Sequence, residues 1–378
     1  MNDNIEIPSS ENQHIEFKSE KVSAKNLAEE IVAFANAEGG EIWLGIEDDR
    51  KITGISRSYE EDVMNICREG VIPPIQPLYQ QIDISGKSIA CISISKGVDR
   101  PYYTSKNRYL IRVGSTKRIA SREELIRLFQ ASGLFHYDIV EISQANLAQL
   151  DLSAISSYFS RYQISFANES EEEKIRLLTA SDILGDNGRP TVGGCLVFGI
   201  SPEKTLPQAG IVFAHFAGNE MGAELIDKKE FGGSLPRQID NALASIKANI
   251  VLPSTIQGTK RVEQKHYPDK VFRELLVNAS VHRNYSIIGS QSRVFMFDDR
   301  IEFRSPGRLP NTVSIEKLSV GTSFSRNPLI VRLMENLNYM DKIGRGLPMV
   351  CQEAKRLETK VEFIESGEEF IVILPWPV

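Results

Sequence analysis

The chain has 378 residues, of which 41% are apolar and 25% charged, and it carries a formal net charge of −6 at pH 7. This composition is typical of a globular protein long enough for two or three domain cores. The acidic balance argues against a protein that coats nucleic acid indiscriminately, and no apolar run approaches the roughly 20 residues that a membrane helix needs.

The four cysteines, at positions 67, 91, 195 and 351, are scattered without a Cys-x-x-Cys pair. That spacing favours reduced thiols and argues against a structural zinc site. Residues 1–12 are polar and acidic and lack the basic-then-apolar order of a signal peptide. We therefore expect a cytoplasmic protein with no membrane partner.

The first strong local pattern lies between residues 10 and 54. Apolar residues between 27 and 35 recur at steps of three and four, which predicts one buried face of a helix over residues 26–37. Gly39 and Gly40 end that helix, and residues 42–46 read as a buried strand. The acidic residues 47–49 follow the strand directly, where carboxylates can face a groove.

A helix over residues 58–70 and two strands, 78–84 and 89–95, come next. Residues 96–127 then hold nine basic and three acidic side chains, with tyrosines among them. Within this stretch, residues 109–113 read as a strand that places Leu110 and Arg112 on one face, and Ser121 to Glu124 form a capping box for a helix.

Basic groups that meet phosphates, beside aromatic rings that stack on bases, favour a nucleic-acid surface. The residues we expect to serve it are Arg108, Tyr109, Arg112, Lys117 and Arg118. The alternative is that this stretch consists of solvated strand and loop residues with the tyrosines half in the core.

Three carboxylates suggest a second chemistry. Glu11, Glu16 and Asp48 could together hold Mg²⁺ or Mn²⁺ and activate a water for phosphodiester cleavage. Glu47 or Asp49 could equally fill the third place. In the competing interpretation Glu16 pairs with Lys18 or another base, and Asp48 only shapes a turn.

The middle of the chain, residues 135–262, reads as a scaffold without chemistry. Residues 145–162 are predicted to be helical, and residues 236–249 form a long helix. Two buried runs, 194–199 and 210–216, read as central strands. His215 is interpreted as a core histidine.

The last third contains a helix from residue 270 onward, opened by Pro268, with Glu274, Asn278 and His282 spaced four apart on one face. Strands are predicted at 292–297 and 300–304, and a closing hairpin at 361–364 and 369–374. Gly344 and Gly346 precede a helix that runs to residue 357, an arrangement suited to phosphate because free amides and the helix dipole point the same way.

The N-terminal motifs resemble the Schlafen-type AlbA-like (AlbA_2) domain. The matching segments are Glu-Phe-Lys at 16–18, Phe-Ala-Asn-Ala-Glu-Gly-Gly at 34–40, Leu-Gly-Ile-Glu-Asp-Asp at 44–49 and Ile-Thr-Gly-Ile at 52–55. The resemblance implies nucleic-acid binding and, from the animal Schlafen proteins, RNA cleavage by a Glu, Glu, Asp set matching Glu11, Glu16 and Asp48. Many bacterial proteins of this type bind without cutting.

The last third resembles the Bergerat (GHKL) ATPase fold in its divergent RecG-like form. The resemblance implies ATP binding, with Glu274 as the base that orients water, Asn278 as the magnesium ligand, and Gly344 and Gly346 as the glycine-rich lid. The family's adenine-reading aspartate should lie just before Gly307, where this chain has Ser305 and Pro306. We therefore expect the fold rather than ATP hydrolysis.

We thus expect a mixed α/β protein in three parts. They are a Schlafen AlbA-like domain at 1–134, a middle α/β scaffold at 135–262 and a Bergerat-like α/β sandwich at 263–378. The expected function is DNA or RNA binding in transcription regulation or defence, by a homo-oligomer. The alternatives are a metal-dependent nuclease and an ATP-driven conformational switch.

Overall fold

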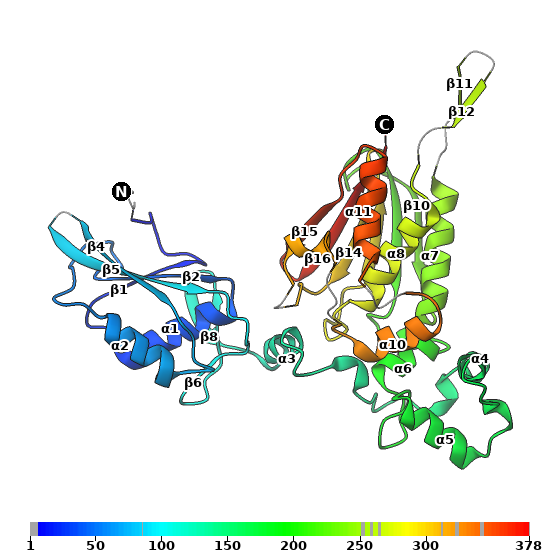
Figure 1. Cartoon of the computed structure of the whole chain (residues 1–378), viewed down its shortest axis with the longest axis horizontal. Coiled ribbons are helices and arrows are strands. Elements are labelled where there is room, and N and C mark those ends of the chain that lie inside the picture. The colour runs from blue at the N-terminus through cyan, green and yellow to red at the C-terminus, as the bar shows by residue number, and fades with distance from the viewer. Residues whose placement is uncertain are drawn as a thin grey trace. The chain divides into compact units, whose positions relative to one another are not determined.

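The computed structural model describes residues 7–84, 86–250, 254–257, 260–263, 266–310, 313–321, 325–340 and 344–377. Residues 1–6, on which the signal-peptide argument partly rests, lie outside this range. The chain divides into two compact units, Met1–Phe135 and His136–Val378, which are described separately. Helices and several sheets occur along it, so the predicted mixed α/β class is confirmed (Figure 1). No helix among the described residues is long and apolar enough to cross a membrane.

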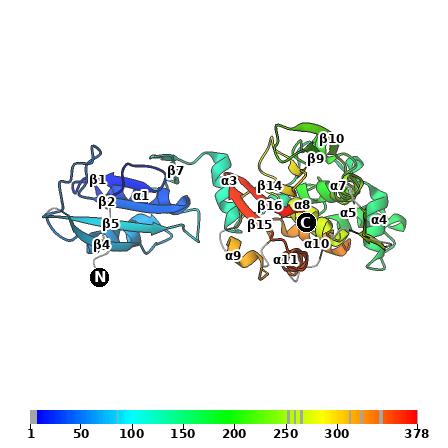
Figure 2. The ribbon, with the colours of Figure 1, turned by 90° about the horizontal axis from the view of Figure 1, so that it is seen from above.

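Unit 1 is built on a four-stranded sheet in the order β1-β2-β5-β4 (Figure 2). The strands are β1 (Ile15–Lys18), β2 (Gly39–Leu44), β4 (Leu78–Ile84) and β5 (Lys87–Ser95), and only β1 and β2 run parallel. The helix α1 (Ala24–Asn36) packs its apolar side on this sheet, as its three-and-four spacing predicted. Its N-cap is Ser23, whose hydroxyl accepts from the Asn26 amide.

Unit 1 contains several shorter elements besides this sheet and α1. They are α2 (Glu60–Asn65), a π-helix (Ile66–Gly70), β3 (Val71–Ile72), β6 (Tyr103–Thr104), β7 (Leu110–Val113), β8 (Thr116–Ile119) and α3 (Arg122–Ala131). The capping box at Ser121 and Glu124 is present, as predicted. Since β7 packs against α1, its inward side chains reach the charged residues of that helix.

The helix α1 ends earlier than the glycine positions predicted. Its last residue is Asn36, and Gly39 instead begins β2 with a φ of +80°. A Cβ at Gly39 would lie 2.6 Å from the Ile94 carbonyl oxygen, so the glycine permits the close approach of β2 and β5.

Unit 2 is built on a six-stranded sheet in the order β10-β9-β13-β14-β16-β15. Its strands are β9 (Ile211–Ala217), β10 (Glu224–Phe231), β13 (Ser292–Met296), β14 (Arg300–Pro306), β15 (Glu362–Ser366) and β16 (Glu369–Pro375). The parallel pair β9 and β13 joins residues that the sequence analysis assigned to the middle segment and to the last domain. One sheet and one core therefore span both segments.

Three long helices pack on this sheet: α7 (Leu235–Asn249), α8 (Asp269–Val281) and α11 (Gly346–Arg356) (Figure 1). Alternate strand residues such as Phe213, Val294 and Phe303 point into the core between sheet and helices. The predicted strands at 210–216, 292–297 and 300–304 and the closing hairpin are confirmed.

One predicted strand is wrong. Residues 194–199 belong to the helix α6 (Val192–Phe198), whose cap is the Thr191 hydroxyl accepting from the Gly194 amide at 3.0 Å. All seven residues of α6 are buried, and an uninterrupted apolar run has no periodicity that separates a strand from a buried helix. The predicted helix at 145–162 is likewise broken into a short 3-10 turn (Leu147–Gln149) and α4 (Leu152–Ser160), with Asp151 as the cap of α4.

The other short elements of unit 2 complete its outline. They are the 3-10 turns Tyr137–Ile139, Phe166–Asn168 and Pro202–Lys204, the helices α5 (Glu171–Ala180), α9 (Ile315–Leu318) and α10 (Pro328–Asn336), and the strands β11 (Ser254–Gln257) and β12 (Lys260–Glu263).

Candidate functional site

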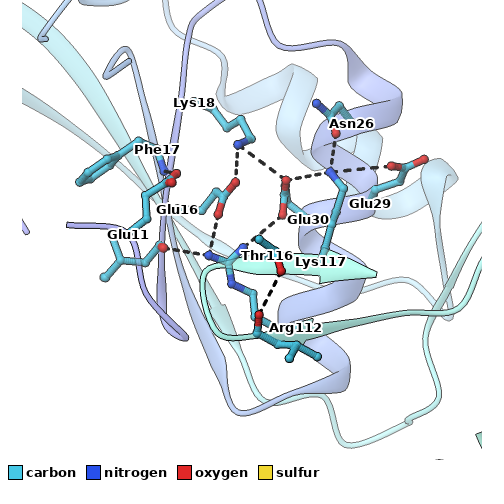
Figure 3. A network of polar contacts seen from close by, with 12 residues as sticks. Glu11, Glu16, Phe17, Lys18, Asn26, Glu29, Glu30, Arg112, Thr116 and Lys117 are labelled. Carbon is cyan, nitrogen blue, oxygen red and sulfur yellow. Dashed lines mark hydrogen bonds and ion pairs between the residues drawn. The ribbon is translucent and has the colours of Figure 1, made fainter. Parts of the chain in front are cut away.

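A buried network of charges lies between α1 and the strands β1 and β7 in unit 1 (Figure 3). The Arg112 side chain, which is 0% exposed, places its guanidinium 2.6 Å from Glu16 and 3.4 Å from Glu30. It also donates to the carbonyls of Asn12 and Ile15, each at 2.9 Å. It lies 4.5 Å from the ring centre of Phe34. Arg112 thus holds β1, β7 and α1 together.

Two lysines enclose the same carboxylates (Figure 3). Lys117 lies 2.7 Å from Glu30, and Lys18 pairs with Glu16 and lies 3.7 Å from Glu30. Burial alone would lower the pKa of Lys18, but the hydrogen bond and charge of Glu16, with the charge of Glu30, leave that pKa raised. Burial raises the pKa of Glu30, and Lys117 opposes the rise.

Most of the residues expected to meet phosphates form ion pairs with acidic side chains of unit 1. Arg112 is buried and paired with Glu16, so its side chain is not exposed to a phosphate in this structure, and its role in nucleic-acid binding stays a prediction. Arg108 pairs with Glu29, and Lys117 with Glu30. The signal for this outcome was present in the sequence: Arg112 shares a strand face with Leu110, and both prove buried.

Arg118 and Tyr109 complete the predicted set. Arg118 makes a two-pronged pair with Glu124, at 2.7 and 2.8 Å, and its side chain is 48% exposed. Tyr109 is half-buried and packs on Tyr103, with ring centres 4.9 Å apart. A phosphate at Arg118 would therefore have to compete with Glu124.

The three carboxylates of the predicted metal set do not form one cluster. A Glu11 oxygen accepts from the Phe17 amide at 2.9 Å, Glu16 is paired with Lys18 and Arg112, and Asp48 is exposed in the turn after β2. Across residues 7–377 as far as the structure describes them, no group of three or more His, Cys, Asp or Glu side chains is placed to hold a metal ion.

The two alternatives for the third carboxylate have local roles. Glu47 accepts from the Thr53 hydroxyl at 3.0 Å, and Asp49 accepts from the Lys51 amide at 3.0 Å. Both therefore shape the turn that follows β2.

The sequence analysis missed a groove of about 440 Å³ in unit 1. Its lining includes Lys25 at the start of α1 and Lys106 in the turn after β6, with Arg108 and the acidic Glu29 and Glu69 beside them. Lys25 and Lys106 are exposed and make no ion pair with any residue that the structure describes. They stand 81 positions apart in the sequence, so only the folded chain reveals that they line the same groove.

In unit 2, a cavity of about 180 Å³ lies between α8, the end of β14 and the loop before α11. All five residues of the predicted nucleotide set line it: Glu274, Asn278, Gly307, Gly344 and Gly346. The structure thus brings together positions that are separated by up to 72 residues in the sequence.

Glycines allow the walls of this cavity to approach closely. Asn278 donates to Glu274 at 2.7 Å, and a Cβ at Gly346 would collide with the Glu274 carboxylate. Gly307 has a φ of +117°, and a Cβ there would lie 2.6 Å from the Asn284 Cβ. A larger residue at Gly307 would be strained by this φ and by the contact with Asn284, and one at Gly346 would displace the Glu274 carboxylate.

The far end of the cavity differs from the family pattern. Ser305 stands where the resemblance placed an aspartate, and its hydroxyl donates to the Ala279 carbonyl at 2.8 Å. Arg326, which sequence reasoning missed, lines this end beside His282. Burial lowers the pKa of Arg326 to about 10, and burial together with the Arg326 charge lowers the pKa of His282 to about 4. At pH 7 the arginine is charged and the histidine neutral.

Residues 11–121 match the family model described as "Schlafen, AlbA_2", and residues 289–374 match the model described as "Putative ATP-dependent DNA helicase recG C-terminal". No curated protein matches the chain.

Two solved structures are similar to the chain. One is the crystal structure of the DIP2311 protein from Corynebacterium diphtheriae, 20% identical with a TM-score of 0.49, covering 97% of this chain and 75% of that one. The other is the NMR structure of the N-terminal domain of a putative ATP-dependent DNA helicase RecG-related protein from Nitrosomonas europaea, 22% identical with a TM-score of 0.24, covering 30% of this chain and 82% of that one. The two family matches identify the chain as one that carries a Schlafen AlbA_2 domain followed by a domain of the recG C-terminal type.

Proposed function

We propose that unit 2 binds a nucleotide in the cavity beside α8. The observation that carries this proposal is the convergence of Glu274, Asn278, Gly307, Gly344 and Gly346 on that one cavity. The match of residues 289–374 to a family described as ATP-dependent supports it. The cavity is smaller than the roughly 300–1,000 Å³ of most ligand clefts.

The small volume implies that the cavity widens when a nucleotide binds. In the open cavity, Asn278 would hold a magnesium ion that neutralises phosphate charge, and Glu274 would orient a water, as the family resemblance implies. With Ser305 in place of an aspartate, the proposed activity is binding with slow or absent hydrolysis.

Retention of radiolabelled ATP on filters tests this proposal. We expect magnesium-dependent retention by the full chain that falls at least about tenfold in Asn278→Ala, the scale of one lost charge-assisted contact. The matched control is Asn168→Ala, at an exposed position outside the cavity. No retention by the unmodified protein, or equal retention by Asn278→Ala, would reject nucleotide binding here.

A second function is favoured by the groove of unit 1. We propose that this unit binds DNA or RNA, with Lys25, Lys106 and Arg108 meeting phosphates at the groove. The support is the Schlafen AlbA_2 match together with two exposed lysines that have no carboxylate partner among the described residues. Regulation of transcription or defence against foreign nucleic acid is the role we propose for such binding, and pairing of two copies would add avidity.

Gel shifts with labelled single- and double-stranded DNA and structured RNA test the groove. The double variant Lys25→Glu/Lys106→Glu should bind more weakly, and its log affinity should fall less steeply with log salt, because each phosphate contact contributes about 0.7–0.9 to that slope. Lys51→Glu, an exposed lysine of the same unit outside the groove, serves as the control. An unchanged slope in the double variant would remove the groove from the binding surface.

The nuclease alternative has less support, because Glu16 is committed to Lys18 and Arg112. Incubation with Mg²⁺, Mn²⁺ or EDTA should leave bound nucleic acid intact on denaturing gels. Asp48→Asn is the informative variant, since Asp48 is exposed and its substitution does not disturb the buried network. Metal-dependent fragments that disappear in Asp48→Asn would restore the nuclease hypothesis.

A further inference from the structure

Arg326 is a buried cation that forms no ion pair with the residues that the structure describes. It is 5% exposed and lines the cavity of unit 2. Its Nη1 donates to the His282 carbonyl at 3.4 Å and its Nη2 to the Arg308 carbonyl, while its Nε has no hydrogen-bond partner. Within the described part of the chain, no carboxylate lies within 4.0 Å of its guanidinium.

Two acidic side chains act on Arg326 through their charge but make their direct contacts with other groups. Glu368 and Glu365 both pull the pKa of Arg326 upward, against the larger effect of burial. Glu368 lies 3.7 Å from Arg308, and Glu365 accepts from the Leu309 amide at 2.7 Å. Since His282 is neutral at pH 7, the end of the cavity next to Arg326 keeps a positive charge, and no carboxylate among the described residues pairs with it directly.

A buried charge without a partner is unfavourable, and a guanidinium offers five N–H donors in a planar fork. Two carbonyls occupy at most two of those donors here. We propose that Arg326 is an anion-binding residue, which holds the phosphate or carboxylate group of a small molecule that enters the cavity. A neutral ligand could fill the hydrogen bonds but would leave the charge uncompensated.

Arg326 lies beside Gly307, at a different position along α8 from Glu274. Arg326 contacts the carbonyl of His282, the residue that ends α8, and Glu274 lies eight residues earlier on the same helix. At about 1.5 Å per residue, the two positions are about 12 Å apart along the helix axis. Either one ligand presents two acceptor groups at this separation, or a separate small anion occupies the Arg326 end.

This inference rests on the proposed function only in requiring that the cavity admits a small molecule. Thermal unfolding of the full chain, followed against concentration of inorganic phosphate, acetate, ATP or adenosine, tests it. The variants are Arg326→Gln, Arg326→Lys and Asn278→Ala. The control is Arg332→Gln, an arginine on α10 that pairs with Asp182 and does not line the cavity.

We expect phosphate or acetate to raise the melting temperature of the unmodified protein and adenosine alone to have a smaller effect. Arg326→Gln should weaken the apparent affinity for the anion at least about tenfold, with Arg332→Gln unchanged. Equal affinity for every anion in Arg326→Gln and the unmodified protein would overturn the inference. If Arg326→Gln does not fold, Arg326→Lys decides, because its ammonium lacks the planar fork: a weaker affinity supports the inference and an equal one overturns it.

The same experiment separates the two proposals. Phosphate or acetate binding that depends on Arg326, without ATP binding, would sustain the anion site and reject the nucleotide. ATP binding that is lost in Asn278→Ala, together with ATP, phosphate and acetate affinities that are all unchanged in Arg326→Gln, would sustain the nucleotide and reject the anion site. No response of the unmodified protein to any anion would reject both, whereas a response to acetate but not phosphate would identify the group as a carboxylate.

Discussion

Two buried arginines, Arg112 in unit 1 and Arg326 in unit 2, have opposite surroundings. In unit 1, Arg112 lies between Glu16 and Glu30, and Lys18 and Lys117 complete the balance. In unit 2, the partners of buried Arg326 among the described residues are two backbone carbonyls. Buried Asp138 likewise accepts from the backbone amides of Leu329 and Ile330, at 2.7 and 3.1 Å, and its second oxygen has no partner.

The difference indicates which buried charges stabilise the fold and which can bind a ligand. A compensated network ties elements together and leaves no charge for a ligand. An uncompensated cation that lines a cavity has a reason to bind an anion. Composition alone favoured Arg112 over Arg326 as a binding residue, since the basic stretch around Arg112 looked like the binding surface.

The largest expected effect is the loss of Arg112. Arg112→Ala leaves Glu16 and Glu30 buried with fewer cations, and removing one partner of a buried pair costs about 3–5 kcal/mol. Urea unfolding measured by the fluorescence of buried Trp43, in a Trp376→Phe background, follows unit 1. A loss below about 1 kcal/mol would show that water or neighbouring lysines compensate the carboxylates, and the comparison would fail.

Asp138 should make the stability of unit 2 depend on pH. Burial raises its pKa from 3.8 to about 6, while the two backbone hydrogen bonds and His136 oppose the rise. The folded state therefore holds its proton over a range where the unfolded chain has lost it, so unit 2 should lose stability as pH rises from about 4 to about 6, with no further loss from this group above. A rise of about two in the pKa of Asp138 corresponds to a loss of roughly 3 kcal/mol in the free energy of unfolding.

Trp376 fluorescence during urea unfolding at several pH values measures this, in a Trp43→Phe background. The difference between the unmodified protein and Asp138→Asn isolates the group, because Asn keeps an acceptor for the same amides but does not titrate. If the free energies of unfolding of the two proteins change in parallel from pH 4 to 6, the pKa of Asp138 is not raised by folding.

Arg326 should contribute little to stability when no anion is present. In phosphate-free buffer, Arg326→Met removes two hydrogen bonds to carbonyls but also an unpaired buried charge, so we expect a change within about 1 kcal/mol. The same unfolding experiment on unit 2 measures it. A loss as large as that of Arg112→Ala would mean that Arg326 is structural.

The smallest effect is expected at the surface. Arg118→Ala breaks the pair with Glu124, but the arginine is about half exposed, and such pairs contribute about 0–1 kcal/mol. Unfolding of unit 1 at low and high salt checks this. A larger, salt-independent loss would place Arg118 with Arg112 among the structural residues.

Sequence patterns sufficed where local spacing sets the structure. The three-and-four spacing of α1 and the capping box of α3 are local, and each is confirmed. They failed for α6, because a fully buried run looks the same in a helix and in a strand. The convergence of Glu274, Asn278 and the glycines was anticipated only through the family resemblance, since nothing local joins α8 to the loop before α11.

By itself, the sequence determined the class of the chain, most of its elements and the face on which Arg112 lies. Only the tertiary structure decided what covers that face. Arg112 meets Glu30 across 82 positions of sequence, and Arg326 reaches the end of α8 across 44. Whether a charge is compensated depends on neighbours that are distant in the sequence, and local residue spacing does not predict them.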